Sequence, residues 1–159
     1  MSGSSSGVEP RRFHPIPAVL ALAQAGWIWW LSSKTLAGPG GPWWSFYGNS
    51  FHFVLFGLLA ILLAETLRTR GGWSTGTLVL VLVLTVAYGI TDEVHQLWTP
   101  GRSADAKDVC VDFLGAVGAL ALWWGVRGPG RLKVALARAF AVGLVMLAFN
   151  AFRAWASTR

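Results

Sequence analysis

Residues 77–90 read TLVLVLVLTVAYGI, an unbroken apolar run that continues into the polar stretch TDEVHQLW and ends at TPGR, residues 99–102. A short run of Val and Leu is also typical of a buried strand, but this run is long and has no internal turn signal, so it predicts a helix. The Pro-Gly pair predicts where that helix ends. Its length is close to the roughly 20 residues that cross about 30 Å of hydrocarbon. We therefore predict a transmembrane helix with one polar end.

Four further segments have the same apolar character, at residues 16–31, 50–67, 108–126 and 134–155. Over all 159 residues, hydrophobic residues make up 54% and charged residues 13%, about half of the roughly 25% charged residues usual in soluble domains. A soluble domain of this size has too little core to hide so much apolar surface. The fold class predicted is therefore all-α, an integral membrane helical bundle with four to five transmembrane helices.

The ends of the chain leave alternatives open. The Ser/Gly-rich start predicts a disordered N-terminal tail over residues 1–12, followed by a single transmembrane domain over residues 13–159. Ala23-Gln24-Ala25 has the pattern of a signal-peptidase site, but the apolar run continues beyond it, which favours an uncleaved anchor. The last segment contains Arg138, so it either spans the bilayer or lies in the interface as an amphipathic helix.

The net charge of +6 is not arranged as a basic stripe with interleaved aromatics, so no nucleic-acid partner is predicted. The cations instead stand between the apolar runs, and cytoplasmic loops carry an excess of Lys and Arg. This rule predicts a multi-pass protein of the cell membrane, with the lipid bilayer as its partner, a cytoplasmic N-terminus and an extracytoplasmic loop around residue 102. The predicted inner side holds Arg11, Arg12, Arg68, Arg70, Arg127, Arg131 and Lys133, against Lys34, Arg102, Lys107, Arg153 and Arg159 outside.

Polar residues gather on one face at the end of the third segment. At 100° per residue, Asp92, His95 and Gln96 share an arc of about 100°, with Glu93 beside Gln96. The opposite face carries only apolar residues, at positions 90, 94 and 97.

The next segment offers a second polar stripe, because Asp108, Asp112 and Gly115 follow the i, i+4, i+7 spacing of one helix face. His52 lies one turn into the second segment on the same predicted side of the bilayer. Three helix ends thus bring ionisable groups to similar depth.

Such carboxylates need partners. A charged carboxylate costs about 2.5–3.5 kcal/mol at the bilayer centre, and whole-domain stability is only about 5–15 kcal/mol. The carboxylates are therefore expected to face a polar cavity, to pair with Arg102 or His52, to hold a cation or to share protons. Asp92, Asp108 and Asp112 are the candidate oxygen ligands for a divalent cation, Mg²⁺ or Ca²⁺. Asp105 and Lys107 are read as ordinary helix-end charges, and Glu65 as paired with Arg68 or Arg70.

Residues 92–102 (DEVHQLWTPGR), Asp108 and residues 112–115 (DFLG) together resemble the signature of the VanZ-like family, and the best-matched region is 49–126. His52-Phe53 matches the end of the family's Asp-Lys-x-x-His-Phe element, whereas the Asp-Lys pair is missing here. The resemblance implies a small multi-helix membrane protein of the cell envelope. The namesake is associated with resistance to the glycopeptide teicoplanin, and no agreed biochemical activity accompanies the name.

Two functions are compatible with these residues. In the first, the polar site binds an envelope lipid, a glycan or a glycopeptide-related ligand from the outer leaflet, with a role in antibiotic resistance. In the second, a membrane-embedded hydrolase or transferase acts on a lipid-linked or phosphorylated envelope substrate. A proton-coupled transporter finds little support in so short a chain without visible repeats. In either role, the predicted binding or catalytic residues are His52, Asp92, Glu93, Gln96, Arg102 and Asp108.

Overall fold

The computed structural model describes residues 14–35, 42–69, 72–127 and 132–156, and these ranges form five helices. Their bounds are α1 Pro15–Ser32, α2 Pro42–Thr66, α3 Thr75–Gln96, α4 Ala106–Arg127 and α5 Leu132–Ala156. Within the described ranges the only extended pairing is an isolated bridge between Thr69 and Gly72. The all-α helical bundle is confirmed.

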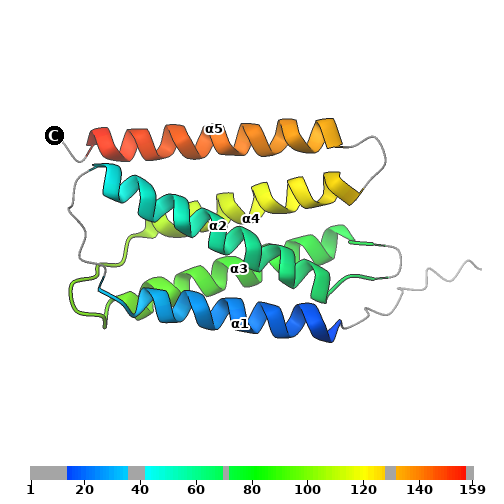
Figure 1. Ribbon diagram of the computed structural model, residues 1–159, viewed down its shortest axis with the longest axis horizontal. Coiled ribbons are helices and arrows are strands. Elements are labelled where there is room, and N and C mark those ends of the chain that lie inside the picture. Colours follow the sequence, from blue (N-terminus) through cyan, green and yellow to red (C-terminus); the bar gives the residue numbers. More distant parts are fainter. Residues whose placement is uncertain (1–13, 36–41, 70–71, 128–131, 157–159) are drawn as a thin grey trace, which may run out of the picture.

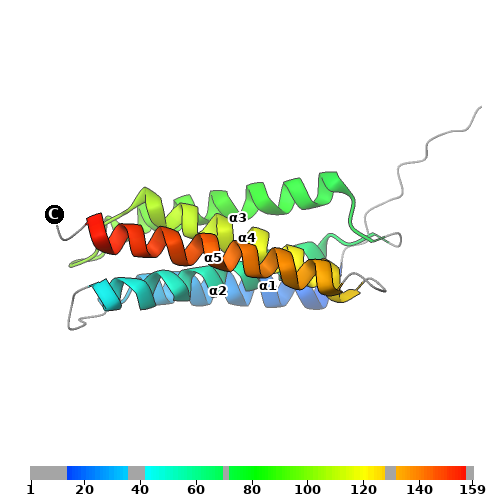
Figure 2. The same cartoon turned by 90° about the horizontal axis from the view of Figure 1, so that it is seen from above.

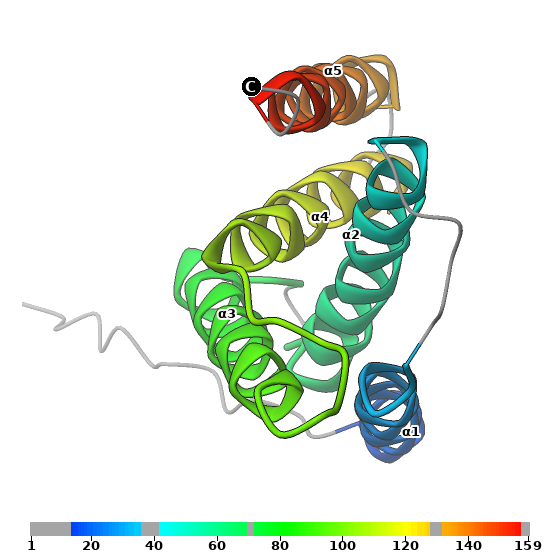
Figure 3. The same ribbon diagram turned by 90° about the vertical axis from the view of Figure 1, so that its left-hand side faces the viewer.

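The helices alternate in direction along a common long axis (Figures 1 and 2). The α3–α4 connection lies at the same end as the start of α2 and the end of α1, while α2 runs into α3, and α4 into α5, at the opposite end (Figure 1). Viewed along the axis, α1 to α4 surround a shared interior and α5 packs outside it against α2 and α4 (Figure 3). The α3–α4 loop crosses the end of the interior (Figure 3).

Local sequence accounts for several helix ends. The Ser74 side chain accepts a hydrogen bond from the Thr77 backbone N–H at 3.1 Å, which caps the start of α3. A proline stands in the first turn of α1, where its missing N–H costs nothing. The predicted bounds of the third and fourth segments agree with α3 and α4 to within two residues, whereas α2 begins at Pro42, eight residues before the predicted start at 50.

Three helices are long and apolar enough to cross a membrane: Thr75–Gln96, Ala106–Arg127 and Leu132–Phe152. The shorter segment Ser50–Thr66 is apolar as well. Apolar side chains such as Val79, Val83 and Leu144 point outward from these helices. Such a surface suits hydrocarbon, so the chain is a membrane protein; the number of crossings stays a prediction of four to five.

The packing of α2 against α4 depends on residues without bulky side chains. A Cβ on Gly115 would lie 3.0 Å from the Cα and the carbonyl carbon of Phe53, and a Cβ on Gly57 would lie 3.0 Å from the Gly115 carbonyl oxygen. Small residues permit this close approach of two membrane helices. The contact also brings His52, the neighbour of Phe53, to the height of α4 at which the predicted carboxylates lie.

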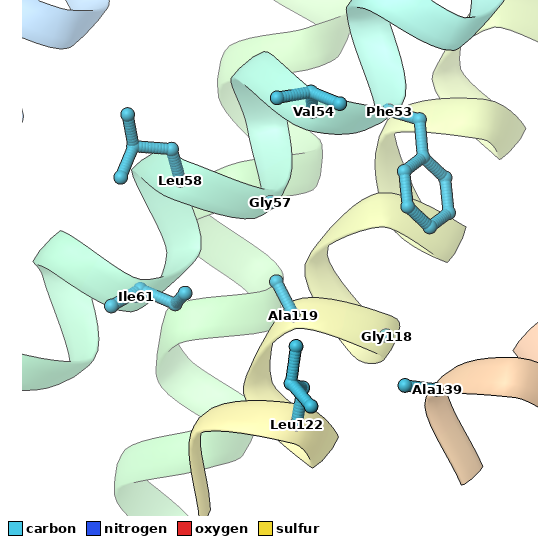
Figure 4. Close-up of a pocket in the computed structure, with 9 residues that line it drawn as sticks. All are labelled: Phe53, Val54, Gly57, Leu58, Ile61, Gly118, Ala119, Leu122 and Ala139. Atoms are coloured by element: carbon cyan, nitrogen blue, oxygen red, sulfur yellow. The ribbon is translucent and has the colours of Figure 1, made fainter. Parts of the chain in front are cut away.

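A groove of about 300 Å³ lies between α2, α4 and α5 (Figure 4). Its nine lining residues are all apolar, and small ones at Gly57, Gly118, Ala119 and Ala139 contribute from all three helices. None of the predicted site residues lines this groove. The polar chemistry of the protein therefore lies elsewhere.

Candidate functional site

The last two turns of α3 bury three polar side chains. Asp92, Glu93 and Gln96 are only 1%, 5% and 3% exposed. The Gln96 Nε2 group donates hydrogen bonds to Asp92 Oδ2 at 3.0 Å and to Glu93 Oε1 at 3.3 Å. The amide thus holds two carboxylates in one arrangement.

The opposite face of this part of α3 is apolar and exposed, as the helical periodicity predicts: Ile90, Val94 and Leu97 are 51%, 43% and 62% exposed. In a bilayer this face meets lipid. The polar face therefore turns toward the other helices of the bundle.

A second part of the site joins α2 to α4. His52 Nδ1 lies 3.2 Å from Asp112 Oδ1, and Asp112 is 1% exposed. The Phe56 ring stacks on the imidazole with 5.9 Å between the ring centroids. The second Asp112 oxygen, Oδ2, faces α3 so closely that a Cβ on Gly89 would lie 2.9 Å from it. Gly89 is three residues before Asp92, so the two halves of the site lie against each other.

The α3–α4 loop is tied down over the site. The Asp105 backbone N–H donates to Glu93 Oε2 at 2.7 Å, and the Thr35 hydroxyl after α1 donates to the Pro100 carbonyl at 2.9 Å. Gly101 adopts a φ of 77°, a left-handed conformation that favours glycine, with Thr35 against it. These contacts give the predicted Pro-Gly-Arg signature a structural reason: the proline and glycine shape the loop that presents the arginine.

Four buried polar atoms of this region have no hydrogen-bond partner in the described part of the chain: Asp92 Oδ1, His95 Nδ1, Arg102 Nε and Asp112 Oδ2. Buried polar atoms are nearly always paired, and leaving one unpaired costs about 1–3 kcal/mol, more for a charged group. Two carboxylate acceptors, one cationic donor and one imidazole nitrogen are thus available for a ligand or for water.

The structure brings most of the predicted site residues together. The charges of Asp92, Asp108 and Asp112 all act on the His52 imidazole, and Glu93 interacts electrostatically with His52, Asp108 and Asp112. Arg102 is partly buried in the loop and forms no ion pair with these groups within the described ranges.

His95 differs from its neighbours on α3. Its ring packs edge-on against Trp29 of α1 with 3.7 Å between the centroids, and Nε2 lies 3.2 Å from the Ser33 hydroxyl. The predicted grouping of His95 with Asp92 on one helix face is therefore imprecise, because His95 lies at the edge of that face and contacts α1.

Sequence reasoning missed two residues that shape the site. Gly89 leaves room for Asp112, and the Tyr88 hydroxyl donates to the Ala25 carbonyl of α1 at 2.5 Å. Neither residue belongs to an ionisable pattern. The one available signal was their position one turn before Asp92 on the same helix.

The predicted cation ligands do not form a ready-made metal centre. Among the described residues, no three His, Cys, Asp or Glu side chains are arranged to hold a metal ion.

The fold and the site together define a class of protein. It is a five-helix membrane bundle with a buried cluster of carboxylates, histidine and glutamine beneath the α3–α4 loop. The model of the VanZ/LLP1 family matches residues 3–127, so the chain belongs to the VanZ/LLP1 family. The match contains all of α1 to α4 and ends at the last residue of α4, so α5 lies outside it. Neither the curated proteins nor the solved structures matched the chain.

Proposed function

We propose that the cluster around Asp92 and Asp112 binds the polar headgroup of an envelope lipid, a glycan or a glycopeptide-related ligand. The observation that carries this proposal is the pair of buried, unpartnered carboxylate oxygens, Asp92 Oδ1 and Asp112 Oδ2. Ionised carboxylates only accept hydrogen bonds. The matching ligand group therefore carries hydroxyl or amine donors, as sugars and aminated headgroups do.

Arg102, half-buried in the α3–α4 loop, supplies the opposite polarity. Its guanidinium has five N–H donors in a planar fork suited to phosphate and carboxylate. Because Nε has no partner in the described chain, an anionic group of the ligand is its natural partner. A ligand that combines sugar hydroxyls or an amine with a phosphate provides partners for the carboxylates and for Arg102.

The proposed setting is the outer leaflet of the cell membrane, with the N-terminus in the cytoplasm. Support comes from the positive-inside rule, because Arg68, Arg127 and Lys133 stand at the end of the bundle away from the cluster. Membership of the VanZ/LLP1 family supports a role in glycopeptide resistance.

The test is protection of cells against teicoplanin. We expect Glu93→Gln and Asp108→Asn each to abolish protection, because each removes a negative charge from the cluster, while the amount of protein in the membrane stays unchanged. Glu65→Gln is the matched control, since Glu65 is also a poorly exposed, hydrogen-bonded glutamate but lies at the other end of α2. Full protection by both site variants would contradict the proposed site.

The second candidate function is a membrane-embedded hydrolase or transferase acting on a lipid-linked or phosphorylated envelope substrate. The His52–Asp112 contact favours it. With Asp112 ionised, Nδ1 donates to it, and Nε2 is left to accept or return a proton as a general base or acid. Glu93 or Asp92 provides a further base, and Arg102 stabilises developing negative charge.

A turnover screen separates the two functions. Purified full-length protein is incubated with lipid-linked envelope precursors, with and without divalent metal, and the products are followed by mass spectrometry. The protein is an enzyme if the wild type turns over a precursor and the variants His52→Gln and Glu93→Gln lose this turnover but still bind the ligand. Binding without turnover, lost in Asp112→Asn, identifies the binding function.

A further inference from the structure

A second charged cluster lies at the opposite end of the bundle, where α2 and α4 end. The Glu65 carboxylate is 12% exposed and receives a hydrogen bond from Trp123 Nε1 to Oε1 at 2.8 Å. Its other oxygen, Oε2, lies 3.4 Å from Arg68 Nε and 3.3 Å from Arg127 Nη2. The expected pairing with Arg68 is confirmed, and Arg70 lies outside the described residues. We call Glu65, Arg68, Arg127 and Trp123 the arginine clamp.

The clamp holds two cations on one anion. Both arginines approach the same Glu65 oxygen, so their guanidinium groups are held next to each other and one positive charge is left uncompensated. The Arg127 guanidinium is also fixed 4.9 Å above the Trp123 ring, a cation–π arrangement that limits its rotamers.

Most of the donors of the clamp have no partner among the described residues. A guanidinium has five N–H groups. Arg68 contacts Glu65 only through Nε, and Arg127 contacts it only through Nη2. Both arginine side chains are 41% exposed. Two adjacent, oriented and exposed guanidinium forks match the oxygens of a phosphate group.

The surroundings of the clamp are basic too. Lys133 and Arg138 are exposed in the first turns of α5 at the same end. In the described ranges, every acidic residue other than Glu65 lies in the polar cluster at the opposite end or in the loop above it, at Asp92, Glu93, Asp105, Asp108 and Asp112. Among the residues that the structure describes, an anion at the clamp therefore meets no competing carboxylate except Glu65.

From this arrangement we propose that the arginine clamp binds the headgroup phosphate of an anionic phospholipid in the leaflet that this end of the bundle faces. The helix ends lie at headgroup depth if α3 and α4 cross the bilayer, and basic sites between membrane helices bind anionic headgroups. The proposal concerns a site separate from the polar cluster and does not depend on its function.

The experiment measures lipid binding to the purified full-length protein in a non-ionic detergent. Native mass spectrometry counts bound phosphatidylglycerol and phosphatidylcholine over a titration of each lipid. We expect phosphatidylglycerol to bind about tenfold more tightly, and Arg127→Gln to remove about tenfold of that affinity, as expected for one lost charge-assisted hydrogen bond. Arg127→Lys, which keeps the charge but not the planar fork, retains part of the affinity and guards against a folding defect.

The matched control is Lys133→Gln, which removes the same charge at the same end but from outside the clamp. We expect it to change phosphatidylglycerol affinity by less than about twofold, since single exposed charges are well screened. Equal losses in Arg127→Gln and Lys133→Gln would mean diffuse attraction and would overturn the clamp.

Two further arms complete the test. Glu65→Gln makes the cluster more positive but removes the group that orients the arginines, so the proposal expects weaker binding; tighter binding would overturn it. Inorganic phosphate at millimolar concentration is expected not to displace the lipid. Displacement would mean that the clamp is a simple anion site and not a lipid site.

Discussion

Gly115→Ala is the substitution for which the structure predicts the largest effect from the smallest change. The added Cβ would lie 3.0 Å from the Phe53 Cα and carbonyl carbon, and closer still to the Phe53 carbonyl oxygen. These are backbone atoms within α2, which cannot rotate away as a side chain can. The helices α2 and α4 must therefore separate where they cross.

The magnitude follows from three contributions. Overpacking of a tight contact costs about 1–3 kcal/mol, and separation also weakens the 3.2 Å contact between His52 and Asp112, a loss of about 0.5–1.5 kcal/mol. Alanine is the better helix former by about 1 kcal/mol, which offsets part of this. The net destabilisation is about 1–3 kcal/mol, which lowers Tm by roughly 3–10 °C for a chain of this size.

The assay is thermal unfolding of the purified protein in detergent, with Gly26→Ala as the matched control. Gly26 is also helical, but a Cβ there would have no atom within 4 Å, so this variant is expected to raise Tm slightly through helix propensity alone. If the two variants gave the same Tm, the close α2–α4 contact would not exist as described and the reasoning would be refuted.

Two further substitutions test the vicinity of the polar cluster. Gly89→Ala places a Cβ 2.9 Å from Asp112 Oδ2 and 3.5 Å from Phe56. Because the carboxylate side chain can shift, we expect little loss of Tm but a loss of teicoplanin protection. Unchanged protection would show that the position of Asp112 is unimportant. Tyr88→Phe removes the 2.5 Å hydrogen bond to the Ala25 carbonyl, which we expect to cost about 0.5–1.5 kcal/mol in thermal unfolding; an unchanged Tm would mean that α1 is not held to α3 by this bond.

The helices themselves could be predicted closely because length and hydropathy are local properties. The α3 and α4 segments needed only their apolar runs and the breaking signals around them. The start of α2 was the exception, since the residues after Pro42 are aromatic and polar in turn and carry no apolar periodicity. A proline at the first position of a helix was the available signal.

The polar side chains divide into those that periodicity could assign and those that it could not. Asp92, Glu93 and Gln96 are buried on the predicted face, opposite Val94. His95 shares the arc but packs on Trp29. Periodicity gives an angle around one helix, whereas the neighbour met at that angle depends on where the other helices lie.

The sequence by itself determined that the segment from residue 77 to about residue 98 is a membrane-length helix with a carboxylate-rich end, because 100° per residue and 1.5 Å per residue are properties of any α-helix. Only the tertiary structure decided that Asp112 contacts His52, sixty residues earlier, and faces Gly89. It likewise decided that Glu65 holds Arg127 as well as Arg68. Such contacts depend on how closely two helices approach, and that distance is set by the fit of Gly115 against the Phe53 backbone, which no pattern within a single helix contains.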